Sequence, residues 1–313
     1  MAAMSLTPTL ASAACWQASF WLARVAAPHW LPHFGCLDSA KGEKAYWAAS
    51  FTGLLHAVVL VVLCVMALLD KPDLLSSTDF FQETDMTQLC CQVFMGYILQ
   101  DLFLSIYFGS AWPGWQTNLI HHVLVLVVWW QLTAGRYAQG PATVAMLCEF
   151  STPFVAMRWF LDRAGMKSST LYIVNGMTML ISFLIFRVIL YSYMLVRIYH
   201  MQDGFLRIPV LNRCLFLLGY FGGAALQYFW FFKIARGAYK TLTAGPPEDK
   251  AAASTPQKSL SQHRPQAKED AKTCASDTAS TTSSEQNSSG ENTDETGQRG
   301  ARIRRGRADK PED

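Results

Sequence analysis

The sequence predicts an all-α, polytopic membrane protein, a bundle of six or seven transmembrane helices. Of its 313 residues, 51% are hydrophobic and only 16% are charged, whereas a soluble domain carries about a quarter charged residues. Several apolar runs reach about 20 residues, the length that crosses the hydrocarbon core of a bilayer. The alternation typical of a β-barrel is absent, so we expect these runs to be helices.

The chain divides by composition into an N-terminal segment, a membrane domain and a polar tail, with bounds at residues 1–40, 41–242 and 243–313. In the N-terminal segment, the apolar stretch 10–30 is interrupted by Gln17 and Arg24. It is therefore either an additional span or an interfacial helix. After Ala244 there is no aromatic residue, and Ser, Thr, Pro, Gln, Lys and Glu dominate. We expect this tail to be disordered.

Six firm spans lie within the membrane domain, at about residues 48–69, 91–110, 116–134, 137–161, 171–196 and 210–235. The basic residues between them favour one side, with Lys41, Lys44, Arg163, Lys167, Lys233, Arg236 and Lys240. Because cytosolic loops carry an excess of Lys and Arg, we expect this side and the C-terminal tail to be cytosolic. The net charge of +3 is too small to indicate a nucleic-acid partner.

Two adjacent histidines are the most informative polar residues. His121 and His122 lie in an almost wholly apolar run, and Glu149 lies in the next apolar segment, close to Pro153. Moving a titratable side chain from water into hydrocarbon costs free energy, so such residues within a span most often mark a functional site. Neighbouring helical positions point about 100° apart, so we expect one histidine to face a cavity and the other a neighbouring helix. Pro153 is expected to kink its helix beside Glu149.

Each of the six spans contributes at least one polar side chain, as expected for one shared polar interior: His56, Asp101, His121, His122, Glu149, Thr152, Asn175, Arg187 and Gln227. The structural alternative makes Asp101 and Arg187 a buried ion pair, with Asn175 and Gln227 as hydrogen-bonding residues between helices. Three residues could ligate zinc, but no spacing resembles a standard site, so we expect no metal and no other cofactor.

Several motifs resemble one family, the TLC domain shared by translocating-chain-associated proteins and ceramide synthases. They are Gly96-Tyr97-Ile98-Leu99-Gln100-Asp101-Leu102, His121-His122, Glu149-Phe150-Ser151-Thr152-Pro153-Phe154, Asn175-Gly176 and Phe186-Arg187. The likeness covers about residues 41–240. It implies a bundle of six or seven helices around a lipid-accessible cavity, in the endoplasmic reticulum or a related membrane.

Ceramide synthases transfer an acyl group from its coenzyme A thioester to a sphingoid amine. They carry a histidine pair and, on the next helix, two acids spaced Asp-x-x-Asp. His121 and His122 match the first element, whereas Glu149 and Thr152 stand at the two acid positions. A threonine cannot orient or charge-stabilise an imidazole as a carboxylate does. The likeness is therefore greater to members that regulate membrane lipid composition.

Three functions follow from these residues. The first is a lipid-homeostasis protein whose cavity binds acyl lipids or phospholipids, with His121, His122 and Glu149 recognising a head group or stabilising the bundle. The second is an acyltransferase using acyl-CoA, with a histidine as general base and Glu149 orienting its ring.

In both, the expected binding residues are Asp101, Thr152, Arg187, His56 and Asn175. The third function is a transporter or scramblase. It needs a hydrophilic groove, and no pattern in the sequence indicates one. We favour the first because the second acid is missing. Membrane lipids are the expected partners, and a homo-oligomer is left open.

Overall fold

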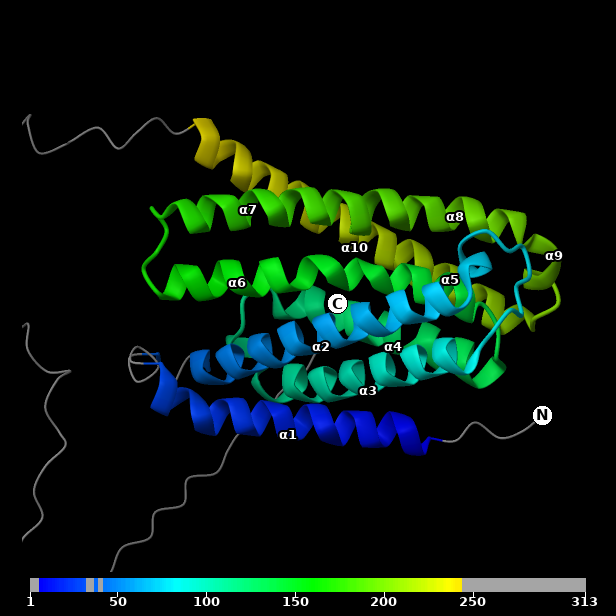
Figure 1. The fold of residues 1–313 in the computed structure, drawn as a ribbon, viewed down its shortest axis with the longest axis horizontal. Helices are drawn as coiled ribbons and strands as arrows, with labels where there is room; N and C mark the ends of the chain where they lie inside the picture. The colour runs from blue at the N-terminus through cyan, green and yellow to red at the C-terminus, as the bar shows by residue number, and fades with distance from the viewer. Residues whose placement is uncertain (1–5, 32–36, 39–41, 244–313) are drawn as a thin grey trace, which may run out of the picture. The chain divides into compact units, whose positions relative to one another are not determined.

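The computed structural model describes residues 6–31, 37–38 and 42–243, and every element in this part of the chain is helical. The longest helices lie side by side (Figure 1). The α-helices are α1 (Thr7–Trp30), α2 (Glu43–Asp70), α3 (Asp85–Phe108), α4 (Trp115–Gly135), α5 (Gln139–Met146), α6 (Thr152–Arg163), α7 (Thr170–Phe183), α8 (Leu190–His200), α9 (Gln202–Phe205) and α10 (Val210–Thr243). The all-α prediction is confirmed. The predicted disordered tail, residues 243–313, lies outside the described residues except for Thr243, which ends α10.

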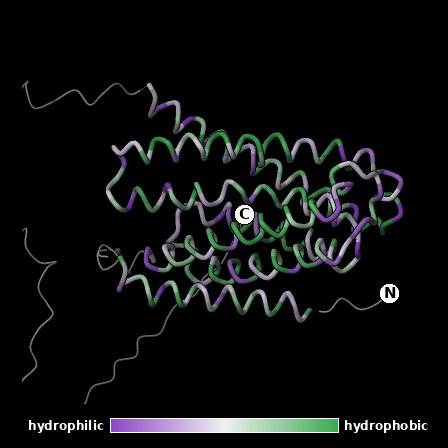
Figure 2. The backbone as a smooth tube through the Cα atoms, viewed as in Figure 1, coloured by the Kyte–Doolittle hydropathy of each residue, from purple (hydrophilic) through white to green (hydrophobic). Residues whose placement is uncertain are grey.

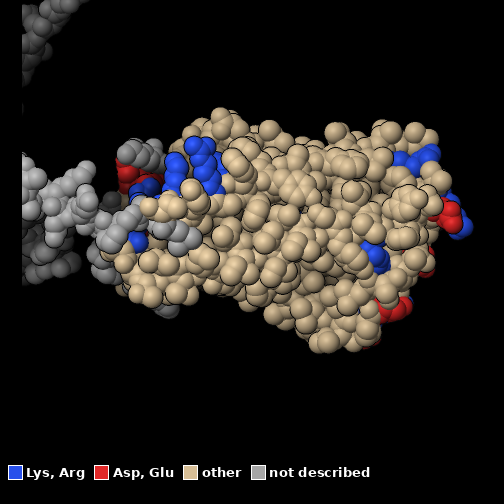
Figure 3. Space-filling view, turned by 90° about the horizontal axis from the view of Figure 1, so that it is seen from above, with Lys and Arg blue, Asp and Glu red and all other residues tan. Residues whose placement is uncertain are grey.

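Six helical segments of the described part are long and apolar enough to cross a membrane: Glu43–Asp70, Asp85–Ala111, Trp115–Gly135, Gln139–Arg163, Thr170–His200 and Val210–Lys240. They are the six predicted spans; five are extended by a few residues, and the fourth is shifted by two. Hydrophobic residues occupy much of the helices' length in Figure 2, and charged side chains gather toward the two ends of the face in Figure 3. The chain is therefore a multi-pass membrane protein.

Helix α1 is not among these six segments, but it packs lengthwise on α3. Phe20 is fully buried, and Ser12 Oγ donates a 3.0 Å hydrogen bond to the Val93 carbonyl. Gly96 makes the close approach possible, because a Cβ there would lie 2.5 Å from Cβ of Ser12. Helix α1 runs alongside α2 and α3 in Figure 1, so it packs along the bundle rather than across it.

Two of the spans depart from the α-helix near their middle. The fourth is broken by a 3₁₀ segment, Leu147–Ser151, and Pro153 lies in the first turn of α6, where its missing N–H is tolerated. The break agrees with the predicted kink beside Glu149. In the fifth span, a π-helical segment, Leu184–Ile189, joins α7 to α8. Such segments are frequent at functional sites, and these two pack against each other.

Candidate functional site

The two irregular segments bring Arg187 and Glu149 together. Arg187 Nη2 lies 3.3 Å from Glu149 Oε1, and the two residues are only 7% and 9% exposed. Thr152 Oγ1 donates to Glu149 Oε2 at 2.6 Å and accepts from Arg187 Nη2 at 2.8 Å. The threonine at the second acid position therefore links the carboxylate to the guanidinium.

The rest of the guanidinium is also bound. Arg187 Nε donates to Ser151 Oγ at 2.7 Å, and Nη1 donates to Gln227 Oε1 at 3.3 Å. The buried charge is thus compensated by hydrogen bonds from three different chain segments, as buried ions require. The bond to Gln227 joins the fifth span to α10, so Gln227 makes the interhelical hydrogen bond that the structural alternative expected.

Asp101 pairs with a histidine instead of with Arg187. Nδ1 of His122 lies 3.2 Å from Oδ2 of Asp101, without the alignment of a hydrogen bond. The suggested Asp101–Arg187 ion pair is therefore wrong. The carboxylate that stands beside an imidazole is Asp101 of α3 rather than Glu149.

The two histidines face different partners, as their 100° separation predicts. His122 is buried toward α3. His121 faces α10, where its ring meets Trp230 edge-on at a centroid distance of 5.2 Å. Its Nδ1 atom is buried and has no hydrogen-bond partner in the described part of the chain. Of the two histidines, His121 is among the residues that line the cavity described next, and His122 is not.

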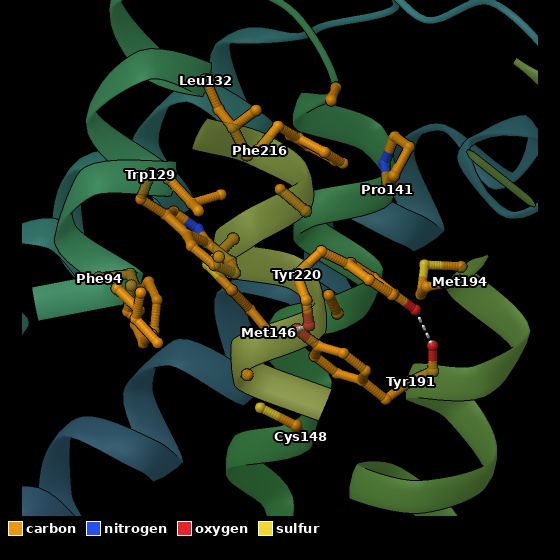
Figure 4. Close-up of a pocket in the computed structure, with 18 of the residues that line it drawn as sticks. Phe94, Trp129, Leu132, Pro141, Met146, Cys148, Tyr191, Met194, Phe216 and Tyr220 are labelled. Carbon is orange, nitrogen blue, oxygen red and sulfur yellow. Dashed lines mark hydrogen bonds between the residues drawn. The ribbon is translucent and has the colours of Figure 1, made fainter. Parts of the chain in front are cut away.

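That cavity, the central pocket, lies between α4, α5, α8 and α10 and opens at one side. Its walls are mainly apolar; in Figure 4 they include Phe94, Trp129, Leu132, Met146, Met194 and Phe216. The polar side chains His121, Glu149 and Gln227 also line it. An apolar pocket with a few polar groups is typical of a ligand site.

A reciprocal tyrosine pair closes one wall of the central pocket. The rings of Tyr191 and Tyr220 stack at a centroid distance of 4.8 Å. Each hydroxyl donates to the main-chain carbonyl of the other residue, which fixes α8 against α10 (Figure 4). Both lie outside the predicted site, and their spacing in the sequence carries no signal for the pairing.

Glycines of α10 bring the helices around the pocket close together. A Cβ at Gly219 would lie 2.1 Å from Val128 Cγ2, and one at Gly223 would lie 2.7 Å from the Tyr191 hydroxyl. The sequence prediction did not use these glycines. Their recurrence within one apolar span, at 219, 222 and 223, is the signal that could have marked α10 as a closely packed wall.

None of the five predicted binding residues lines the central pocket. Two of them, His56 and Asn175, also lie outside the Arg187 network and the Asp101–His122 pair. His56 is fully buried, and its ring stacks on Tyr97 at 3.8 Å. Neither of its nitrogens has a hydrogen-bond partner among the described residues. Asn175 donates from Nδ2 to the Phe154 carbonyl at 2.9 Å. It therefore joins α7 to α6, which is the structural role that the sequence left open.

No group of three His, Cys, Asp or Glu residues within the described ranges is arranged to hold a metal ion. The side chains of the site can donate and accept hydrogen bonds, form ion pairs and transfer protons.

A family model for the TLC domain matches residues 46–236, more than half of the chain. The chain belongs to the TLC domain family. This confirms the predicted resemblance, and the matched region begins in α2 and ends in α10. The TLC domain therefore contains the central pocket and the Arg187 network, whereas α1 precedes it.

Similar proteins carry the same domain. TLC domain-containing protein 4-B of Xenopus laevis is 27% identical over 203 residues, covering 64% of this chain and 77% of that protein. Human TLC domain-containing protein 4 is 24% identical over 151 residues, covering 47% and 57%. TLC domain-containing protein 2 of Danio rerio is 26% identical over 156 residues, covering 48% and 61%.

Proposed function

We propose that this TLC domain protein acts in membrane lipid homeostasis by binding an acyl lipid in the central pocket. The observation that carries the proposal is the uneven lining of the pocket. Most of its wall is hydrocarbon and aromatic, while His121, Glu149 and Gln227 contribute polar atoms. A lipid matches this pattern, since it joins an apolar chain to a polar head group.

The unpaired ring nitrogen of His121 also supports a ligand. A buried polar atom without a partner costs about 1–3 kcal/mol, and Nδ1 of His121 is such an atom among the described residues. A hydroxyl, ester or amide of a bound lipid would supply the missing hydrogen bond. Arg187 compensates the charge of Glu149, so the pocket does not require a cationic ligand.

Filling the pocket tests the proposal. Ala145 lines the central pocket, so Ala145→Phe should expel the lipid. Ala225→Phe is the matched control, because Ala225 is exposed on α10. Native mass spectrometry of the purified chain should find an acyl lipid on the wild type and the control but not on Ala145→Phe. Equal lipid occupancy on all three folded proteins would refute binding in this pocket.

Cells lacking the protein give the second test. We expect a broad shift in phospholipid composition that the wild-type chain reverses and Ala145→Phe does not. We also expect the rescuing protein in the endoplasmic reticulum, the membrane that the family likeness suggests.

Acyl transfer from acyl-CoA is a second candidate, favoured by one contact. Asp101 lies beside His122, and a carboxylate that orients an imidazole supports a general base. Against it, neither His122 nor Asp101 lines the central pocket, whereas His121 does and has no carboxylate beside it in the described contacts.

The two functions differ in what they predict for an acyl-CoA assay. For binding alone, the purified chain forms no acylated product from acyl-CoA and amine or alcohol acceptors. For acyl transfer, product forms with the wild type, is abolished in folded His122→Ala, and is strongly reduced in Asp101→Asn.

A further inference from the structure

A second cavity lies toward the opposite ends of the helices from the acidic loop between α2 and α3. It holds about 1400 Å³ of space between atoms, counted with its open side, and lies mainly between α6, α7 and the C-terminal part of α10. We call it the basic-end cavity. Its charged lining residues are Arg158, Asp162 and Lys233.

Arg158 is held in place by its surroundings. Its guanidinium lies over the Tyr172 ring, 4.4 Å from the centroid. Gly176 leaves room for it, since a Cβ there would lie 2.8 Å from Nη1. An arginine stacked on an aromatic ring keeps its fork of N–H donors directed and available. Arg158 forms no ion pair with a described carboxylate, as the ion pairs in this part of the chain involve other residues.

Lys233 adds a second cation from α10. Its ammonium lies 5.3 Å from the Phe229 ring centroid, and it too has no carboxylate partner in the described ranges. Asp162 does not neutralise this pair of cations, because its carboxylate binds Lys167 at 2.7 Å. The cavity therefore has an excess of positive charge that the described side chains leave uncompensated.

The other lining residues are those of a membrane interface. Tyr46, Trp159 and Tyr172 line the cavity, and such aromatic residues lie at the level of lipid head groups. Val155 and Ile173 line it as well and are 43% and 47% exposed, so apolar surface continues from the cavity onto the outside of the helices. A ligand of this cavity should therefore be anionic at one end and apolar at the other.

We propose that the basic-end cavity binds the phosphate group of an anionic membrane lipid, with Arg158 and Lys233 as the phosphate ligands. Basic pockets between transmembrane helices bind anionic head groups, and arginine binds phosphate through paired N–H groups. The lipid's acyl chains lie along Val155 and Ile173. This site is separate from the central pocket and does not depend on the function proposed for that pocket.

Three probes separate the parts of the ligand. Dioleoylphosphatidic acid carries phosphate and chains, dioleoylglycerol carries the same chains without phosphate, and glycerol 3-phosphate carries phosphate without chains. Binding of each is measured by native mass spectrometry in detergent, on the purified full chain carrying Ala145→Phe, which fills the central pocket and removes acyl-lipid binding there. We expect phosphatidic acid to bind at least about tenfold more tightly than either of the others, as one charge-assisted contact contributes about that factor.

Variants assign the binding to the cavity. Arg158→Gln and Lys233→Gln should each weaken phosphatidic acid about tenfold. Arg236→Gln is the matched control, since Arg236 is exposed on the same helix and does not line the cavity. Lys233 is itself exposed, so its replacement keeps the test valid if Arg158→Gln fails to fold.

The remaining outcomes overturn the proposal in distinguishable ways. Equal binding of phosphatidic acid and dioleoylglycerol would exclude recognition of phosphate. Equal binding of glycerol 3-phosphate and phosphatidic acid would make the ligand a soluble phosphate compound instead of a lipid. Unchanged phosphatidic acid binding in Lys233→Gln, or an equal loss in Arg236→Gln, would place the phosphate elsewhere.

Discussion

Arg187 and Glu149 form a buried ion pair across 3.3 Å, although 38 residues separate them in the sequence. Each lies in a segment that departs from the α-helix, one π-helical and the other 3₁₀. The backbone irregularities and the polar network therefore coincide. Because Ser151, Thr152 and Gln227 also bind the guanidinium, the network joins the fourth, fifth and sixth spans.

Removing either member of this pair should strongly destabilise the fold. Glu149→Gln and Arg187→Met each leave an uncompensated buried group, and we expect the free energy of unfolding to fall by about 3–5 kcal/mol. Reversible unfolding in bicelles measures the change. The control is Glu83→Gln, which breaks the ion pair to Arg136, whose side chain is 57% exposed; its expected loss is about 0–1 kcal/mol. A loss at Glu149 no larger than at Glu83 would show that the buried network does not stabilise the bundle.

His56 should behave as a packing residue. The variant His56→Phe preserves the stack on Tyr97 and removes two ring nitrogens that have no described partner. We expect the free energy of unfolding to stay equal or rise by up to about 1 kcal/mol, with lipid binding unchanged. His122→Phe, which loses the contact to Asp101, should lower the free energy of unfolding. If His56→Phe instead abolishes lipid binding while remaining folded, His56 belongs to the site.

Gly96 should be required for docking of α1. Any larger side chain must displace Ser12 or the Thr9 carbonyl, which lie 2.5 and 2.7 Å from a Cβ built at this position. We expect Gly96→Leu to reduce the free energy of unfolding by about 1–3 kcal/mol through overpacking, and to make α1 sensitive to trypsin at Arg24. Gly237→Leu is the control, because a Cβ at Gly237 meets nothing within 4 Å. In this variant, α1 should resist trypsin as it does in the wild type. Unchanged protease resistance in Gly96→Leu would mean that α1 is held by other contacts.

The orientation in the membrane can be read with single cysteines. Ser168 and Ser76 are exposed residues at opposite ends of the bundle, and Ser168 adjoins the basic loop of Arg163 and Lys167. On a cysteine-free background, the excess of basic residues predicts that Ser168→Cys is labelled from the cytosolic side and Ser76→Cys from the other. An impermeant maleimide applied to sealed, oriented microsomes distinguishes them. The reverse labelling pattern would invert the expected topology and move the basic-end cavity to the lumenal face.

The sequence alone determined the membrane class, the six spans and most of the polar residues that meet inside the bundle. These follow from the physics of the bilayer, because each span must be apolar over about 20 residues and each buried polar group stands out against that background. The 100° step between neighbouring helical positions was also enough to separate the directions of His121 and His122.

The tertiary structure decided which polar groups meet. Asp101 stands beside His122, and Glu149 binds Arg187, because the order in which helices pack and their rotation about their own axes depend on contacts distant in sequence. The 3₁₀ and π segments also shift the register of the side chains that follow, which an ideal helical period does not predict. The pockets are likewise products of packing, since glycines on α10 and side chains from several helices shape them together.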